Sequence, residues 1–441
     1  MKKNESNASN RIPPDKIESV FSKVLISKNI INKDDTSAVF IDLSFLKNRI
    51  NELKKAFPKS TIHTAAIKAN PLPKILNFVK SQGLGFEAAS LPELYTARKT
   101  GISSNKILFD SLSKTIIELE YALKAGVYVN ADSLNELERI DFILNKIKSK
   151  SKIGLRINPQ VGTGRIKITS VAGSYSKFGV PILERRKEII KAYQKYNWLC
   201  GIHLHIGSQG CILPQLVKGT NLVYNLAEEI NSNSISKNKI RYFDIGGGLP
   251  VSYLSTKKEI TFNQYAISLK RNCPELFTGR YSLITEFGRH IFANSAWAVS
   301  RIEYIKNESN LPDDQGGIKT LMIHLGADMF IRESYNQTEW PHEFLVLNKK
   351  GRIIKSRKKS QFTIAGPLCF AGDLIGRNVE LPKPSQNDFL IIRDVGAYTF
   401  SMWSRYNSRQ MPKILGYLLD GKYFNFLKNR ETLEDVRNFW I

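Results

Sequence analysis

The most informative residue of this 441-residue chain is Lys68, which directly follows an apolar stretch from Ile62 to Ile67. A lysine amine that loses its proton in a desolvated site becomes a nucleophile and can hold an aldehyde as a Schiff base. A single lysine after a strand is more often simply hydrated at the surface. The case for chemistry at Lys68 therefore depends on the motifs that follow it.

A run of three glycines, Gly246 to Gly248, follows a short apolar segment. Backbone amides without side chains form a concavity that can bind a phosphate group. The run could equally be a tight turn, and it is not a dinucleotide-binding fingerprint because the GxGxxG spacing is absent. The hydroxyl groups of Ser208 and Tyr398 are candidate further donors, which favours a phosphate ester as the ligand.

Glu286 and Arg289 lie at the end of another apolar segment, Leu283–Glu286. Considered alone, an acid and a base at this spacing form a structural ion pair. Beside an aldehyde-binding lysine and a phosphate cradle, however, a carboxylate has a specific use. It keeps a pyridine nitrogen protonated, so that the ring accepts electrons. The three features fit one cofactor, pyridoxal 5′-phosphate.

Two histidines, His203 and His205, alternate along one expected strand and so share one of its faces. A metal pair is one interpretation, but one strand supplies only two ligands and the sequence shows no third. Stacking of His205 on a flat cofactor ring explains the site without an ion. We therefore predict no bound metal.

Eight short apolar segments alternate with amphipathic stretches between about residues 60 and 295, a pattern typical of a closed (β/α)8 barrel of the TIM type. The motif residues follow the ends of these segments, where barrel active sites are assembled. We predict an α/β protein with an N-terminal extension over residues 1–35 that packs partly on a second domain. The barrel is expected over 36–295, and a strand that precedes it, around Thr36 to Asp42, is expected to join the second, mainly β domain over 296–441. The expected barrel strands are Ile62–Ile67, Gly85–Ala89, Ile107–Phe109, Val127–Asn130, Ile153–Ile157, Ile202–Ile206, Tyr242–Ile245 and Leu283–Glu286.

The composition is that of an ordinary globular protein, with 42% hydrophobic residues. The polar segment Met1–Arg11 lacks the apolar centre of a signal peptide, and no segment is long and apolar enough to span a membrane. The four cysteines show no CxxC spacing, which predicts free thiols, a reducing compartment and a cytoplasmic location. The formal charge of +25 is dispersed along helical segments, so nucleic-acid binding is the weaker interpretation.

Taken in order, the motifs resemble those of the pyridoxal-phosphate decarboxylases that include diaminopimelate and ornithine decarboxylases, which are built on the alanine-racemase-like barrel (fold type III). The resemblance runs from about residue 36 to the C-terminus. It implies a homodimer that acts on a small amino-acid-type substrate. The matching segments are Ala66–Asn70, Glu87–Ser90 with Glu93, His203–Gln209, Gly246–Gly248, Glu286–Arg289, Gly366–Cys369 with Asp373, and Asp394–Tyr398 with Tyr406 and Asn407.

The resemblance also implies a role for each matching residue. Lys68 would hold the cofactor, Glu286 would pair with its pyridine nitrogen and His205 would stack on its ring. Cys369 and Tyr398 would reach the site from the neighbouring subunit, where Cys369 would protonate Cα after carbon dioxide leaves. The phosphate would be bound by Ser208, Gly246, Gly247, Gly248, Arg289 and Tyr398, and the Schiff-base side would be lined by Glu87, Glu93 and Arg156.

One departure from the family pattern concerns the substrate. Enzymes of this group that act on diamino acids carry an acid directly after the cysteine, and this chain has Phe370. An ammonium against phenylalanine loses its hydration, and a cation–π contact returns only about 1–2 kcal/mol. We therefore predict an apolar, acylated or carrier-linked distal end and not free diaminopimelate, ornithine or lysine. Further substrate contacts are assigned by position to Asp328, Arg332, Tyr335 and His342.

Two alternatives share the same fold. A racemase or epimerase would deprotonate Cα instead of releasing carbon dioxide, and carbon dioxide release separates the two reactions. A non-catalytic relative would bind a protein partner. Retention of Lys68, Glu286 and Cys369 argues against that second alternative, because a protein without the reaction has no chemical use for them.

Overall fold

The computed structural model describes residues 10–27, 30–233, 239–257, 259–307 and 319–441, which form two compact units. One unit comprises Arg49–Val251 and Ile260–Ile291 and is called the barrel unit below. The other comprises Met1–Asn48, Ser252–Glu259 and Phe292–Ile441 and is called the β unit; its first nine residues lie outside the described part.

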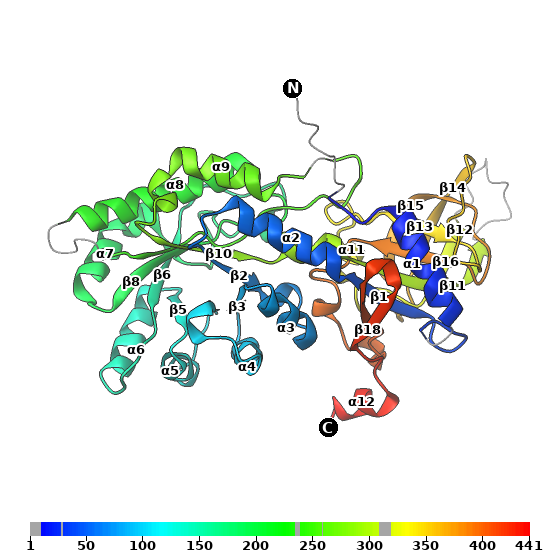
Figure 1. The fold of residues 1–441 in the computed structure, drawn as a ribbon, viewed down its shortest axis with the longest axis horizontal. Coiled ribbons are helices and arrows are strands. Elements are labelled where there is room, and N and C mark those ends of the chain that lie inside the picture. Colours follow the sequence, from blue (N-terminus) through cyan, green and yellow to red (C-terminus); the bar gives the residue numbers. More distant parts are fainter. Residues whose placement is uncertain (1–9, 28–29, 234–238, 258, 308–318) are drawn as a thin grey trace. The chain divides into compact units, whose positions relative to one another are not determined.

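The barrel unit is a closed ring of eight parallel strands, in the order β2-β3-β4-β5-β6-β8-β9-β10 and back to β2 (Figure 1). This confirms the predicted (β/α)8 barrel. A ninth, two-residue strand, β7 (Val180–Pro181), adds to β6. The ring strands are β2 (Ile62–Ala66), β3 (Gly85–Ala88), β4 (Ile107–Phe109), β5 (Tyr128–Ala131), β6 (Ile153–Asn158), β8 (Leu199–Leu204), β9 (Tyr242–Asp244) and β10 (Ser282–Phe287).

Helices follow the strands and lie outside the ring (Figure 1). Side chains placed at their starts explain where several begin: Ser90, Thr115 and Ser133 each accept a hydrogen bond from the backbone amide three residues on. None of the described helices has both the length and the apolarity needed to cross a membrane. The helices of this region are α2 (Leu43–Ala56), α3 (Pro73–Ser81), α4 (Leu91–Lys99), α5 (Ile116–Ala125), α6 (Leu134–Leu144), α7 (Ile182–Lys195), α8 (Leu213–Ser232), α9 (Phe262–Asn272) and α10 (Arg289–Phe292).

The β unit is built on a nine-stranded mixed sheet. Its main path runs β15-β14-β12-β11-β1-β17-β18, and β16 joins β13 to β11. Its helices are α1 (Pro14–Ser27), α11 (Ile331–Tyr335) and α12 (Leu433–Asn438). The strands are β1 (Ser37–Asp42), β11 (Ala296–Asn307), β12 (Lys319–Ile323), β13 (Phe344–Leu347), β14 (Lys359–Ala365), β15 (Leu374–Pro382), β16 (Phe389–Arg393), β17 (Lys413–Leu418) and β18 (Tyr423–Lys428).

The strand that precedes the barrel belongs to this sheet, because β1 pairs antiparallel with β11 and parallel with β17. Phe40 of β1 stacks on Trp297 of β11 with ring centroids 4.3 Å apart, and Phe21 of α1 packs on the same indole. The segment Ser252–Glu259 also groups with the β unit, where Ser255 donates a hydrogen bond to Glu343. The units therefore differ at their edges from the continuous ranges expected from the sequence.

Candidate active site

Charged side chains line the interior of the barrel at the carboxyl ends of its strands. The register pairs Arg156 of β6 with His203 of β8, and His203 with Asp244 of β9. Residues in register on neighbouring parallel strands project from the same face of a sheet. All three side chains are buried. The fold thus places a cation, an imidazole and a carboxylate side by side inside the ring.

Lys68 lies in the turn after β2 and contacts Glu87 of β3. Its Nζ is 2.6 Å from both carboxylate oxygens of Glu87, which is fully buried. The Lys68 side chain itself is 41% exposed. The desolvated amine assumed from the sequence is therefore not what the structure shows, because a buried carboxylate holds Lys68 while leaving it open to a ligand.

Glu286, at the end of β10, has a buried carboxylate oxygen that lacks a donor. Its Oε1 has no hydrogen-bond partner among the described residues. Burial and then the neighbouring Asp244 raise the pKa of Glu286 well above its ordinary range, whereas His203 acts to lower it. A buried carboxylate without a donor is costly. This oxygen suits a ligand that brings its own N–H group, such as a protonated pyridine ring.

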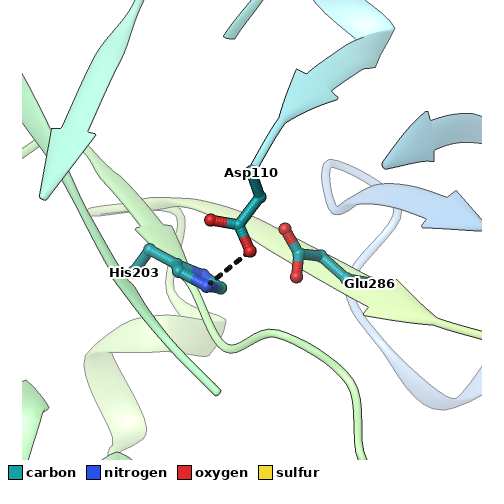
Figure 2. Close-up of side chains that lie close together, drawn as sticks. All are labelled: Asp110, His203 and Glu286. Atoms are coloured by element: carbon teal, nitrogen blue, oxygen red, sulfur yellow. Dashed lines mark ion pairs between the residues drawn. The ribbon is translucent and has the colours of Figure 1, made fainter. Parts of the chain in front are cut away.

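His203 lies between two carboxylates. Its Nε2 is 3.4 Å from Asp110 Oδ2, and its Nδ1 is 3.2 Å from Asp244 Oδ2. Figure 2 shows His203, Asp110 and Glu286 pointing toward one another. Burial acts to lower the pKa of His203, but Asp110, Glu286 and Asp244 together raise it well above its ordinary value. The three carboxyl groups thus favour the protonated form of the imidazole.

The three groups of Figure 2 are close enough to share a metal ion, since their ligand atoms lie within 4.8 Å of one another. Two features oppose that use. A metal-bound imidazole needs a free lone pair, and both ring nitrogens of His203 face carboxylates. Arg156 also places a guanidinium nitrogen 3.4 Å from the same oxygen of Asp110. The arrangement is better described as a buried ion network.

His205 and the glycine run are joined by a hydrogen bond. The Gly247 amide donates to His205 Nδ1 at 3.1 Å, and the Gly246 amide donates to Asp244 Oδ1 at 2.9 Å. Burial, followed by Arg156, lowers the pKa of His205 well below its ordinary value, so the ring is neutral and can accept this bond. Two of the three glycine amides therefore already donate within the protein.

The glycine run also brings three strand ends into close contact. A Cβ atom on Gly246, Gly247 or Gly248 would lie 2.5, 2.3 or 2.2 Å from a backbone oxygen of the neighbouring strand ends. Nearby, Arg289 Nε donates to Ser208 Oγ at 3.2 Å. A guanidinium, a hydroxyl and closely packed backbone without side chains suit a phosphate group. The barrel unit thus suits both polar ends of pyridoxal phosphate, the ring nitrogen and the phosphate group.

We expect Gly247→Ala to weaken cofactor binding more than it lowers the stability of the protein. The new methyl group would meet the carbonyl oxygen of Glu286, so the end of β10 must shift. Overpacking of this kind costs about 1–3 kcal/mol of stability. Titration of the variant with pyridoxal phosphate should show weakened binding. Gly173→Ala is the matched control, because its Cβ would meet only a methyl group at 3.4 Å; equal effects of the two changes would contradict the prediction.

Two other expected site residues have clear local partners. Arg156 lies 3.7 Å from Asp132 in addition to Asp110, and its guanidinium stacks on the ring of Phe178 at 4.7 Å. Glu93 lies in the first turn of α4 and accepts a hydrogen bond from the Ala89 amide. Its own amide donates to Ser90. The structure therefore gives Glu93 a capping role.

Cys369 lies on a tightly held loop of the β unit. Its amide donates to Asn407 Oδ1 at 2.7 Å, and Tyr406 donates to its carbonyl oxygen at 3.0 Å. The carboxylate of Asp373 accepts the amides of Ala327 and Leu368 at 2.6 Å each, which fixes the loop from behind. Cys369 is exposed, unlike the three other cysteines. Its thiol is thus presented on a rigid backbone.

Phe370 lines a cavity of about 370 Å³ within the β unit, which we call the aromatic cavity. Phe370 and Tyr406 meet edge to face with centroids 6.0 Å apart. None of the described residues that line the cavity carries a charge. Its walls are Ala327, Ile331, Tyr335, Leu368, Phe370, Ser404 and Tyr406.

The remaining expected substrate contacts each have partners within the β unit. Asp328 is fully buried and accepts from Arg409 at 2.9 Å, so it does not line the aromatic cavity. Arg332 stacks over Trp340 at 4.2 Å and donates to the Tyr398 carbonyl. His342 is held by Glu333 at 3.0 Å. Only Tyr335 and Phe370 of the expected set line this cavity.

Sequence reasoning did not assign roles to Asp244 or to His203, although both belong to the ion network of the barrel. A charged residue inside an otherwise apolar strand is a readable signal, because burial of an unpaired charge is costly. Asp244 within Tyr242–Ile245 is such a residue. Its partner could not be read from the sequence, because it lies on another strand.

Comparison with known proteins agrees with this geometry. Residues 43–293 match the family model for the pyridoxal-binding domain of pyridoxal-dependent decarboxylases. Diaminopimelate decarboxylase of Aquifex aeolicus is 30% identical over 396 residues, which is 89% of this chain and 89% of that protein.

Solved structures show the same similarity. Diaminopimelate decarboxylase of Helicobacter pylori in complex with L-lysine superposes with a TM-score of 0.81 at 27% identity, covering 95% of this chain and 98% of that one. The enzyme of M. jannaschii, also in complex with L-lysine, gives a TM-score of 0.82 at 26% identity, covering 95% and 94%.

Proposed function

The chain belongs to the pyridoxal-dependent decarboxylases, and from this membership we propose that it removes the α-carboxylate of an amino acid whose distal end carries no free ammonium group. The reaction class, a pyridoxal-phosphate-dependent carboxy-lyase acting on small amino-acid substrates, follows from the family. The nature of the distal end is our proposal. It depends on one observation, the uncharged aromatic cavity that contains Phe370.

Different barrel residues would bind the cofactor and control the charge on its ring. Lys68 is the amine to which the cofactor aldehyde would be joined, and Arg289 with Ser208 would bind the phosphate. Bound pyridoxal phosphate supplies an electron sink for the charge left on Cα when carbon dioxide departs. Glu286, whose Oε1 lacks a donor among the described residues, would hold the proton on the pyridine nitrogen. Glu87, which holds the free Lys68 ammonium, would pair with Lys68 again once the substrate amine has displaced it from the cofactor.

Cys369 is proposed as the group that protonates Cα. In this reading the chain is a homodimer, and Cys369 and Tyr398 of one subunit complete the barrel site of its neighbour. Support comes from the exposed thiol on a loop fixed by Asn407, Tyr406 and Asp373. A proton donor needs a fixed position and access to the substrate, and this loop offers both.

We expect Cys369→Ala to lower kcat about 100-fold while the protein still binds its cofactor, because general acid catalysis is lost and the barrel is unchanged. The visible absorption band of the lysine-bound cofactor checks the second half of the prediction. Cys211→Ala, at a buried thiol of the barrel unit, is the control. Full activity of Cys369→Ala would rule out its role as the proton donor.

The substrate proposal follows from the chemistry of the aromatic cavity. An ammonium group placed there would lose its hydration without a carboxylate to replace it. Asp328, which directly follows the lining residue Ala327, is already paired with Arg409. An acyl, aromatic or carrier-linked extension would instead bury apolar surface against Phe370 and Leu368, which favours binding by about 25 cal/mol per Å².

Diaminopimelate is the second candidate, because the relatives named above are diaminopimelate decarboxylases. The test is incubation of the purified protein with a panel of L- and D-amino acids, meso-diaminopimelate, ornithine, lysine and acylated diamino acids, read by mass spectrometry for loss of carbon dioxide. We expect turnover of acylated or otherwise uncharged distal ends. Efficient turnover of meso-diaminopimelate would overturn the proposal. Phe370→Glu should shift preference toward free diamino acids.

A further inference from the structure

We infer that His203 is a positioning residue for the decarboxylation. Its imidazolium makes the nearby Glu286 carboxylate a weaker base. The proton shared between Glu286 and the pyridine nitrogen of the cofactor therefore stays on the nitrogen. The inference rests on the proposed function, in which Glu286 faces the pyridine nitrogen. His203 acts through Glu286 and has no part in bond making or breaking.

The geometry encloses His203 among acids. It is fully buried on β8, with Asp110 at 3.4 Å on one side and Asp244 at 3.2 Å on the other. Glu286 completes the cluster, within 4.8 Å of both His203 and Asp110. Figure 2 shows the imidazole and the two carboxyl groups of Asp110 and Glu286 converging on one small volume. All of these side chains are buried, so their charges interact strongly.

The charge balance of this chamber explains why a cation is needed. Its buried carboxyl groups are Glu87, Asp110, Asp132, Asp244 and Glu286. The facing cations are Lys68 at Glu87 and Arg156 at Asp110, and His205 is neutral. Among the described residues, the hydrogen-bond donors to Asp244 are neutral: the Asn130 side chain at 3.2 Å and the Gly246 amide. Without a charge on His203, Asp244 would face Glu286 with no cation between them.

Directions of the pKa shifts agree with this picture. Asp244 is the charged group that most raises the pKa of Glu286, and His203 is the one that most lowers it. His203 in turn has a raised pKa, so its positive charge is fully present below about 6.5 and is lost only as the pH rises through the elevated value. The effect of His203 on Glu286 therefore does not require acidic conditions.

A direct test uses pyridoxal phosphate labelled with ¹⁵N at the ring nitrogen, because the ¹⁵N chemical shift reports whether this atom carries a proton. We expect a protonated nitrogen in the native holoenzyme. In His203→Gln, the protonation equilibrium should move at least about tenfold toward the unprotonated ring. His63→Gln is the matched control: His63 is also a buried barrel histidine, but burial, then Lys54, lowers its pKa to about 4, so the change removes no charge.

A charge-compensating variant separates electrostatics from packing. Adding Asp244→Asn to His203→Gln removes one anion together with the cation, so protonation of the ring nitrogen should return. The new amide can be accommodated, because Asn130 Oδ1 has no hydrogen-bond partner among the described residues and can accept from it after a flip. Failure of the double variant to restore the native shift, with the protein folded, would indicate a purely structural role and overturn the inference.

The outcomes distinguish this inference from the proposed function. An unprotonated ring nitrogen in the native protein would contradict the proposed role of Glu286, and with it both the proposed function and the inference about His203. A ring that stays protonated in His203→Gln would overturn only the inference. If the variants do not fold, ¹⁵N-histidine labelling of the native protein decides: one of its six imidazoles should stay doubly protonated well above neutral pH. Loss of every imidazolium at ordinary pH would overturn the inference.

Discussion

Replacement of Lys68 by alanine is expected to abolish the covalent attachment of pyridoxal phosphate and to lower kcat by about 10⁴-fold. The change removes the amine that would join the cofactor aldehyde and leaves Glu87 buried without its ion partner. The visible band of the lysine-bound cofactor should disappear. Borohydride reduction of the native holoenzyme followed by peptide mass spectrometry should place the label on Lys68.

Lys68→Arg is the control for this change. A guanidinium can keep the ion pair with Glu87, but it stays protonated and cannot form the covalent bond. The arginine variant should therefore retain more thermal stability than the alanine variant while showing the same loss of the band. A label on any other residue after borohydride reduction would contradict the assignment of Lys68 as the cofactor-binding lysine. It would also contradict the placement of the cofactor site in the barrel.

The second large effect is expected at Glu286. Glu286→Gln removes the negative charge that holds a proton on the pyridine nitrogen, so the ring should lose most of its capacity as an electron sink. We expect kcat to fall about 1000-fold. Covalent attachment to Lys68 should persist, because that amine belongs to the turn after β2. Steady-state rates together with the absorption spectrum measure both halves of the prediction.

Glu228→Gln is the matched control for Glu286→Gln. Glu228 is a partly buried carboxyl group on α8 that accepts a hydrogen bond from Tyr281, outside the ring of strands. The same loss of charge there should leave kcat within about twofold of the native value, as is usual for a change remote from the reacting atoms. A rate for Glu286→Gln close to that of this control would remove Glu286 from the chemistry.

The barrel could be predicted from the sequence because its strands are short apolar runs separated by amphipathic helices. Each expected strand overlaps one that the structure contains, and β4 (Ile107–Phe109) is reproduced at both ends. The capping role of Glu93 was also readable, since Ser90 precedes it by three residues. Signals of this kind are local, and local signals need no knowledge of how strands pair.

The ion network could not be predicted, because it depends on pairing. His203 meets Asp244 only because β8 and β9 are neighbours in a specific register, and it meets Asp110 across the barrel interior. The state of Lys68 has the same origin: its partner Glu87 lies on β3. A sequence shows which residues carry charge, but the ring of strands decides which charges meet.

The aromatic cavity is built entirely from the β unit, whereas the proposed cofactor site is assembled in the barrel unit. The proposed binding of the substrate's distal end and the proposed binding of the cofactor therefore depend on separate stretches of the chain. From the proposed role of the aromatic cavity, we expect that a library varying Tyr335, Phe370 and Tyr406 would alter substrate scope while leaving the sequence around Lys68 unchanged. Such a library is a starting point for engineering decarboxylases toward bulky amino-acid derivatives.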